Sequence, residues 1–152
     1  MDLVKNGVLK IEDVEELEKE LNTKLPDDYV EFLMQSNGGF FDEAKMISID
    51  GIASRIGVEK MWGYNTGYKS ADILTWTKQY VPKTQNNTVI IGADYANNNI
   101  IMITKDEDKG IYYWDSRIAF ENSTEDECVY WIADTFSEFI EILDASGEHQ
   151  TD

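Results

Sequence analysis

One stretch near the N-terminus decides the fold of this chain: Leu25-Pro26-Asp27-Asp28-Tyr29-Val30-Glu31-Phe32-Leu33-Met34-Gln35-Ser36-Asn37-Gly38-Gly39. Pro26 has a fixed φ angle and no backbone N–H, which suits the first position of a helix, and the two aspartates after it favour the positive end of the helix macrodipole. Tyr29, Phe32 and Leu33 fall at helical spacing, so they form one buried face. The paired glycines can take the left-handed conformation that ends a helix. The stretch therefore predicts a short amphipathic helix.

A second helix is predicted just upstream, over residues 11–21. Ile11, Val14, Leu17 and Leu21 recur at helical spacing, and six acidic residues stand between them. This pattern is typical of a helix with one buried face and one solvated acidic face. Only about four residues separate the two helices, so we expect an N-terminal αα-hairpin.

The middle of the chain contains further predicted elements. Residues 45–49 predict a short strand, and residues 52–70 show no firm period. Residues 71–80 predict a helix that ends before Pro82. Three runs of β-branched and aromatic residues then predict strands that form an antiparallel meander, over residues 88–92, 100–104 and 110–115.

A closing helix of about four turns is predicted from six apolar residues at helical spacing: Val129, Ile132, Ala133, Phe136, Ile140 and Leu143. Residues 144–152 have nothing to bury, so we expect them to fray. Helices, a strand meander and a closing helix together indicate an α+β domain.

Composition bounds the class of protein. The chain has 152 residues, which is one domain's worth, and 6 Phe, 8 Tyr and 4 Trp exclude a disordered chain. A single cysteine excludes a disulfide framework. No stretch is apolar enough for a membrane span, and no apolar region follows the first lysine as in a signal peptide. We therefore expect a soluble, cytoplasmic protein of one domain, residues 1–152.

The net charge of −17 is unevenly distributed. Residues 61–105 hold two acidic and four basic residues, whereas residues 106–152 hold 14 acidic and two basic residues. Such a field repels nucleic acid and anionic membranes, and it attracts basic proteins. The charge alone favours a solvated surface that serves only solubility over a functional acidic patch.

Catalytic groups are scarce in the sequence. The only histidine, His149, lies in the predicted tail, and Cys128 stands beside acidic residues that raise the pKa of a thiol. No glycine-rich phosphate loop occurs. Asp106–Gly110 resembles the start of a calcium loop, but Arg117 occupies the position of the bidentate glutamate, so we interpret it as a hairpin turn. The sequence predicts no enzyme, no cofactor and no metal site.

The ordered set of motifs is similar to that of the SUKH superfamily, which includes SyD-type proteins and the fungal cell-wall-assembly regulators. The acidic helix, the Leu-Pro-x-x-Tyr start at Leu25 and the Asn-Gly-Gly stop at Asn37 carry the resemblance. Later blocks at 89–94, 110–115 and 133–139 follow in the same order, so the resemblance spans about residues 11–143. One departure is the turn at Tyr95–Asn99, where members often have glycines.

The resemblance implies a central, mostly antiparallel sheet flanked by helices. For most bacterial members it also implies an immunity protein that binds and neutralises a toxin domain, frequently a nuclease. The residues shared with the family are mainly structural: Leu25, Pro26, Tyr29, Gly38, Gly39 and Phe136.

No partner-binding residue follows from the family motif, so the contact is predicted from charge and aromaticity. A nuclease site is rich in Lys and Arg, and an acidic surface competes for those groups. We predict contact through Asp42, Glu43, Asp106, Glu107, Asp108, Glu121, Glu125, Asp126 and Glu127, with Trp62 or Tyr64 as an aromatic anchor.

Two alternatives to an immunity protein stay open. One is a regulatory interaction module without a toxin partner. The other is an enzyme or small-ligand protein that uses clustered carboxylates, which predicts a metal-dependent thermal shift.

Overall fold

The computed structural model describes residues 2–81, 87–115 and 129–148. Their central element is a seven-stranded antiparallel sheet in which every strand pairs with the next one along the chain. The strands in chain order are β1 (Leu3–Lys5), β2 (Gly39–Ile47), β3 (Ile56–Met61), β4 (Thr88–Asp94), β5 (Asn99–Ile103), β6 (Gly110–Trp114) and β7 (Val129–Ala133). The predicted α+β class, antiparallel sheet and β4–β6 meander are confirmed.

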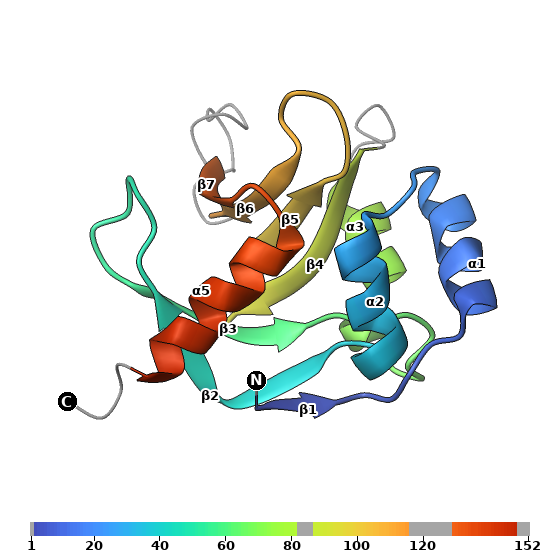
Figure 1. The fold of residues 1–152 in the computed structure, drawn as a ribbon, viewed down its shortest axis with the longest axis horizontal. Coiled ribbons are helices and arrows are strands. Elements are labelled where there is room, and N and C mark those ends of the chain that lie inside the picture. Colours follow the sequence, from blue (N-terminus) through green and yellow to red (C-terminus); the bar gives the residue numbers. More distant parts are fainter. Residues whose placement is uncertain (1, 82–86, 116–128, 149–152) are drawn as a thin grey trace.

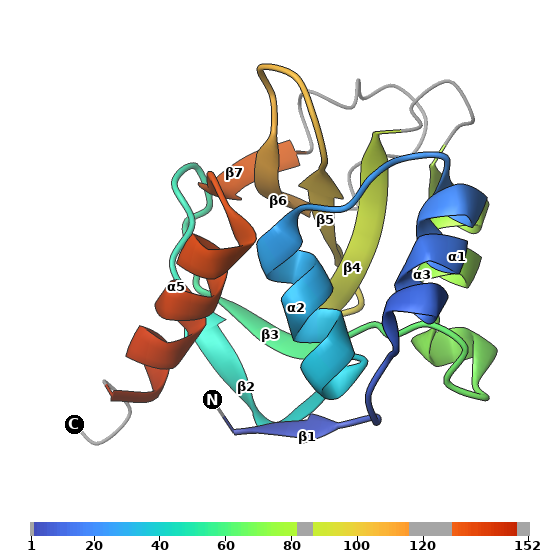
Figure 2. The same cartoon turned by 45° about the vertical axis from the view of Figure 1, so that its right-hand side comes forward.

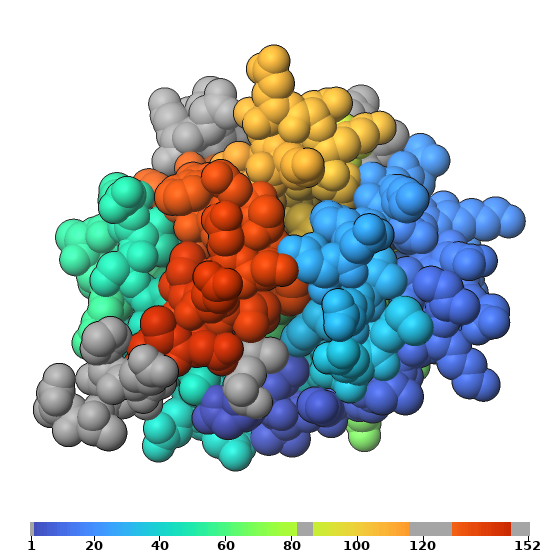
Figure 3. Space-filling model, in the orientation of Figure 1, coloured from blue at the N-terminus to red at the C-terminus, as the bar shows by residue number. Residues whose placement is uncertain are grey.

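Helices α2 (Asp27–Ser36) and α5 (Phe136–Glu148) lie side by side on one face of the sheet (Figures 1 and 2). Their side chains cover that face in the space-filling view (Figure 3). Tyr29 of α2 meets Phe136 of α5 edge to face, with ring centroids 4.9 Å apart. The Asp28 carboxylate also accepts hydrogen bonds from the backbone and hydroxyl of Ser137, both at 2.9 Å.

Helix α1 (Ile11–Leu21) runs antiparallel to α2 and contacts it, which confirms the predicted αα-hairpin (Figure 2). Val14 and Leu17 are fully buried, whereas Ile11 is 45% exposed. Pro26 is the residue before the first helical position of α2 rather than the first position itself. Asn37, not a glycine, is the left-handed residue directly after α2, with φ +48°.

A short 3-10 turn, η1 (Lys69–Ala71), precedes helix α3 (Ile73–Tyr80), so the predicted helix begins two residues later than expected. The Asp72 carboxylate caps α3 by accepting from the backbone N–H of Thr75 at 3.0 Å. Helix α3 contacts β4 and α1. The Thr77 hydroxyl accepts from the backbone N–H of Ile90 at 3.0 Å, which ties α3 to β4.

The predicted helix that begins at Val129 is wrong in its first part. Residues 129–133 form strand β7, which pairs with β6, and α5 begins only at Phe136. Helix α5 continues to Glu148, past Asp144, where fraying is predicted to begin, and residues 149–152 lie outside the described residues. Among the residues described, no helix is long and apolar enough to cross a membrane.

Candidate functional site

The Asn37–Gly39 corner holds the segment that leaves β3. The Asn37 side chain donates to the carbonyl oxygen of Tyr64 at 3.1 Å and accepts from the backbone N–H of Tyr64 at 2.8 Å. A Cβ atom on Gly38 would collide with the carbonyl oxygens of Met61 and Trp62. The two backbones therefore touch, which fixes Trp62 in place.

A row of side chains crosses the open face of the sheet, which is the face turned away from α2 and α5. The strand register pairs Phe40 with Lys60, Lys60 with Ala93, Ala93 with Asn99, and Asn99 with Trp114. Cross-strand partners project from the same face. Phe40 is 44% exposed, whereas its chain neighbours on β2 are buried, as the period of two in a strand requires.

Aromatic rings from the residue after β3, from α3 and from β6 form a continuous series at this face. Trp62 stacks on Trp76 with ring centroids 5.4 Å apart, and Trp76 stacks on Tyr80 at 5.7 Å. Tyr80 then meets Trp114 edge to face at 6.4 Å. The indole N–H of Trp76 donates to the Ser70 carbonyl at 3.0 Å, which holds η1 against α3.

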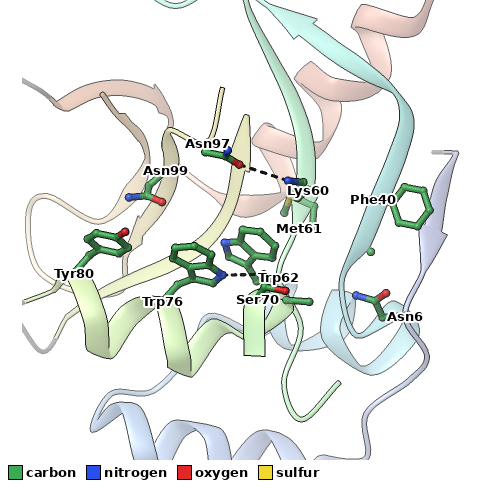
Figure 4. Close-up of a pocket in the computed structure, with 12 residues that line it drawn as sticks. Asn6, Phe40, Lys60, Met61, Trp62, Ser70, Trp76, Tyr80, Asn97 and Asn99 are labelled. Atoms are coloured by element: carbon green, nitrogen blue, oxygen red, sulfur yellow. Dashed lines mark hydrogen bonds between the residues drawn. The ribbon is translucent and has the colours of Figure 1, made fainter. Parts of the chain in front are cut away.

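A cavity of about 530 Å³ opens between this series and the row on the sheet (Figure 4). Its lining residues come from the β1–α1 connection, β2, β3, η1, α3 and the β4–β5 region: Asn6, Gly39, Phe40, Lys60, Met61, Trp62, Ser70, Ala71, Trp76, Tyr80, Asn97 and Asn99. In Figure 4 the rings of Trp62, Trp76 and Tyr80 lie beside α3, and Phe40 lies on the other side of Lys60 from them.

The polar side of the cavity depends on a tight turn. The buried Asp94 carboxylate accepts from the backbone N–H groups of Ala96 at 2.9 Å and Asn98 at 2.8 Å, and from the Tyr113 hydroxyl at 2.6 Å. This network shapes the turn in which Asn97 has φ +65°. The Lys60 ammonium, 3.5 Å from both the Glu59 carboxylate and the Asn97 amide oxygen, lies beside it.

Two of the indole N–H groups in this aromatic series are buried without a hydrogen-bond partner. They belong to Trp62 and Trp114, the two ends of the series. Leaving a buried donor unsatisfied costs roughly 1–3 kcal/mol. These two unsatisfied donors therefore indicate that the open face could be covered by a partner that accepts hydrogen bonds from them.

The structure separates the two predicted aromatic anchors. Trp62, 7% exposed, lines the cavity. Tyr64 is also buried, but its hydroxyl donates to the Glu16 carboxylate of α1 at 2.9 Å. Burial, followed by the hydrogen bond to Glu16, raises the pKa of Tyr64 to about 12. Tyr64 therefore links α1 to the β3–η1 connection.

The predicted acidic contacts do not form one cluster. Asp42 and Glu43 are exposed on β2, and Asp106, Glu107 and Asp108 are exposed in the β5–β6 turn. Figure 1 shows β2 and this turn at opposite ends of the molecule. Glu121, Glu125, Asp126 and Glu127 lie outside the described residues, as do Cys128 and His149.

The Asp106–Gly110 segment lies in the hairpin turn between β5 and β6, as predicted, with Asp106 at φ +73°. Across the part of the chain that the structure describes, no group of three or more His, Cys, Asp or Glu side chains could hold a metal ion.

Sequence reasoning missed most of the cavity. It named Trp62 as an aromatic anchor, but it gave no role to Phe40, Lys60 or Asn99. The neutral charge of residues 61–105 is the signal that could have found this face, because an interface centre is depleted of charged residues.

Comparison with known proteins identifies the family. No curated protein matches the chain in a sequence search. A family model, that of the SMI1 / KNR4 family (SUKH-1), matches residues 9–142. The matched region runs from just before α1 into α5, and so includes the whole αα-hairpin and the described strands after it. The chain therefore belongs to the SMI1 / KNR4 family (SUKH-1).

Proposed function

We propose that the protein is a bacterial immunity protein, which binds and neutralises the toxin domain of a secreted toxin made by the same cell or its kin. Membership of the SMI1 / KNR4 family carries the proposal, because that family includes immunity proteins. The protein acts in the cytoplasm by occluding the toxin, without catalysis of its own.

Charge supports a basic toxin domain, with a nuclease as the expected class. A nuclease holds phosphates with Lys and Arg, and a chain of net charge −17 attracts such a surface. The exposed acids on β2 and in the β5–β6 turn lie far apart in Figure 1. We therefore assign to both groups of acids a role in long-range attraction. At most one of the two groups contacts the toxin directly.

A survival assay tests the proposal. The C-terminal domain of the large secreted protein encoded beside this chain is expressed in a host cell, with and without the chain, and survivors are counted. A catalytically dead toxin domain serves as the control for expression burden. Rescue by this chain is the expected result.

Two results would contradict the proposal. A toxic domain that this chain fails to rescue shows that the pairing is wrong. The absence of any such neighbouring protein favours a regulatory interaction module instead.

A further inference from the structure

We propose that the cavity between β2, β3 and α3 receives a neutral aromatic side chain of a protein partner. We further propose that a main-chain carbonyl of the partner accepts a hydrogen bond from the free indole N–H of Trp62. The inference rests on the proposed function in one respect, which is that the partner is the toxin domain. It adds to that function a central contact in the interface, which the scattered acids do not define.

Charge at the cavity favours a neutral occupant. Lys60 is the single charged side chain among the described lining residues, although the chain has 30 acidic residues. A lysine or arginine entering here would meet the Lys60 ammonium and no lining carboxylate. The Lys60 ammonium is already close to the Glu59 carboxylate and the Asn97 amide oxygen, so an incoming anion would gain little from binding it.

The size and chemistry of the cavity favour an aromatic occupant. About 530 Å³ lies within the range of roughly 300–1,000 Å³ typical of ligand sites, and it is ample for an indole or phenol ring. Its walls include the rings of Phe40, Trp76 and Tyr80. Aromatic pairs add roughly 0.5–1.5 kcal/mol beyond the area that they bury.

The buried Trp62 nitrogen is the independent observation that points to a ligand. Trp62 is 7% exposed, and its Nε1 has no hydrogen-bond partner. Figure 4 shows this nitrogen on the side of the ring that faces Trp76 and Tyr80 rather than Phe40. Because the nitrogen is shielded in the free chain, an occupant must displace a side chain of the wall to reach it, and the half-buried Trp76 stacks on that ring.

The surroundings of the cavity favour a protein over a small molecule. Phe40 pairs across the sheet with Val4, and these two apolar side chains are 44% and 40% exposed beside the opening. A small ligand inside the cavity would leave both exposed to water. A protein that inserts one side chain covers them with the residues around it, in the way that near-neutral contacts surround a hot spot.

The first experiment uses the free protein and does not depend on a toxin. The ¹⁵N-labelled chain is titrated with unlabelled N-acetyl-L-tryptophanamide, and the four indole N–H signals are followed after each has been assigned by a Trp→Phe substitution. We expect a saturable downfield shift of the Trp62 signal. Trp131, 48% exposed on β7 and outside the cavity, is the internal control.

Two further probes define the occupant. N-acetylglycinamide has the acceptor without the ring, and N-acetyl-L-lysinamide replaces the ring with a cation. Neither should shift the Trp62 signal at the same concentration. The proposal is overturned if the lysine probe binds as well as the tryptophan probe, or if all four indole signals shift alike.

The second experiment uses the toxin survival assay. Phe40→Thr removes a wall of the cavity while keeping strand propensity, and we expect it to lower the number of surviving cells roughly tenfold or more. The matched control is Met34→Gln. Met34 lies in α2, which packs on the opposite face of the sheet, and it is 36% exposed, so this variant should rescue like the unmodified chain.

The outcomes separate the two proposals. If the unmodified chain fails to rescue, the proposed function fails, and the probe titration alone decides whether the cavity takes an aromatic group. If the unmodified chain and Phe40→Thr rescue equally, the function stands and the cavity is not the toxin contact, even when the tryptophan probe binds.

Discussion

At the scale of single residues, two buried tyrosine hydroxyls differ in what surrounds them. The hydroxyl of Tyr113 donates to the Asp94 carboxylate at 2.6 Å, whereas the hydroxyl of Tyr29 has no partner. Burial raises the pKa of both hydroxyls, and at Tyr113 the bond to Asp94 adds to the effect. The fold therefore gains from one hydroxyl and bears a desolvation cost for the other.

Removing each hydroxyl should accordingly have opposite effects on stability. We expect Tyr29→Phe to leave the free energy of unfolding unchanged or to raise it by about 1 kcal/mol, since an unsatisfied buried group disappears. We expect Tyr113→Phe to lower it by roughly 2 kcal/mol, because Asp94 loses a donor. Urea unfolding of the two variants measures both values, and equal losses in the two would contradict the assignment of these hydroxyls.

Tyr64 predicts a loss of stability at high pH. Its pKa is raised to about 12, above the value of about 10 in an unfolded chain, so the folded state keeps the proton longer. The stabilisation is complete below about pH 10 and is lost as the pH rises toward 12. We expect the melting temperature of the unmodified chain to fall over this window. The melting temperature of Tyr64→Phe should fall less steeply, because Tyr64 no longer titrates, but it should still fall, because Tyr29 and Tyr113 do. Parallel curves for the two proteins would exclude a contribution from Tyr64.

At the scale of elements, the corner after α2 does more than end a helix. Gly38, at φ +73°, allows its backbone to touch that of Met61 and Trp62, and Asn37 holds Tyr64 from the other side. The Asn-Gly-Gly motif thus places the segment that carries Trp62. Gly38 is therefore required for two reasons: its φ angle is positive, and the neighbouring backbone leaves no room for a Cβ atom.

A glycine comparison separates these two reasons. We expect Gly67→Ala, where φ is +92° and the added Cβ meets open space, to cost about 1 kcal/mol from backbone strain alone. Gly38→Ala should cost at least about 3 kcal/mol, because the added Cβ also collides with two backbone carbonyls. The measurement is the urea midpoint of each variant, and similar losses would show that contact with β3 is unimportant.

The αα-hairpin of α1 and α2 and the β4–β6 meander could be predicted, because the sequence patterns of both depend on local spacing. Strand β7 could not, because Val129, Ile132 and Ala133 fit both a helix face and an apolar strand. Pairing with β6 decided between the two. A capping signal was available at Thr135-Phe136-Ser137-Glu138, since the Thr135 hydroxyl accepts from the backbone N–H of Glu138 at 3.1 Å.

The open-face row lay beyond sequence reasoning for a different reason. Phe40, Lys60, Asn99 and Trp114 meet only through the register of four strand pairs, and three of those pairs contain bulges. A bulge changes which side chains share a face, and nothing local in the sequence marks it. Trp62 alone was predicted, from its aromaticity.

At the scale of the whole molecule, charge and apolar surface are separate. The described lining of the cavity has no carboxylate, whereas exposed acids lie elsewhere on β2 and in the β5–β6 turn. This division suits a two-step encounter, in which long-range attraction precedes a short-range contact.

The attraction predicts how association depends on salt. We expect the association rate with the toxin domain to fall tenfold or more between 50 and 500 mM salt, with a smaller change in dissociation. Asp106→Asn, Glu107→Gln and Asp108→Asn together should lower the rate at low salt more than Glu12→Gln, Glu15→Gln and Glu141→Gln, which remove the same charge elsewhere. Stopped-flow measurement tests this, and a rate independent of salt would rule out steering.

The proposed function requires that this chain neutralises a toxin by binding it. The most direct measurement titrates the purified chain into the purified toxin domain while the domain's activity on its own substrate is followed. We expect activity to fall linearly to the background at one chain per toxin domain. Unchanged activity in the presence of excess chain would contradict it.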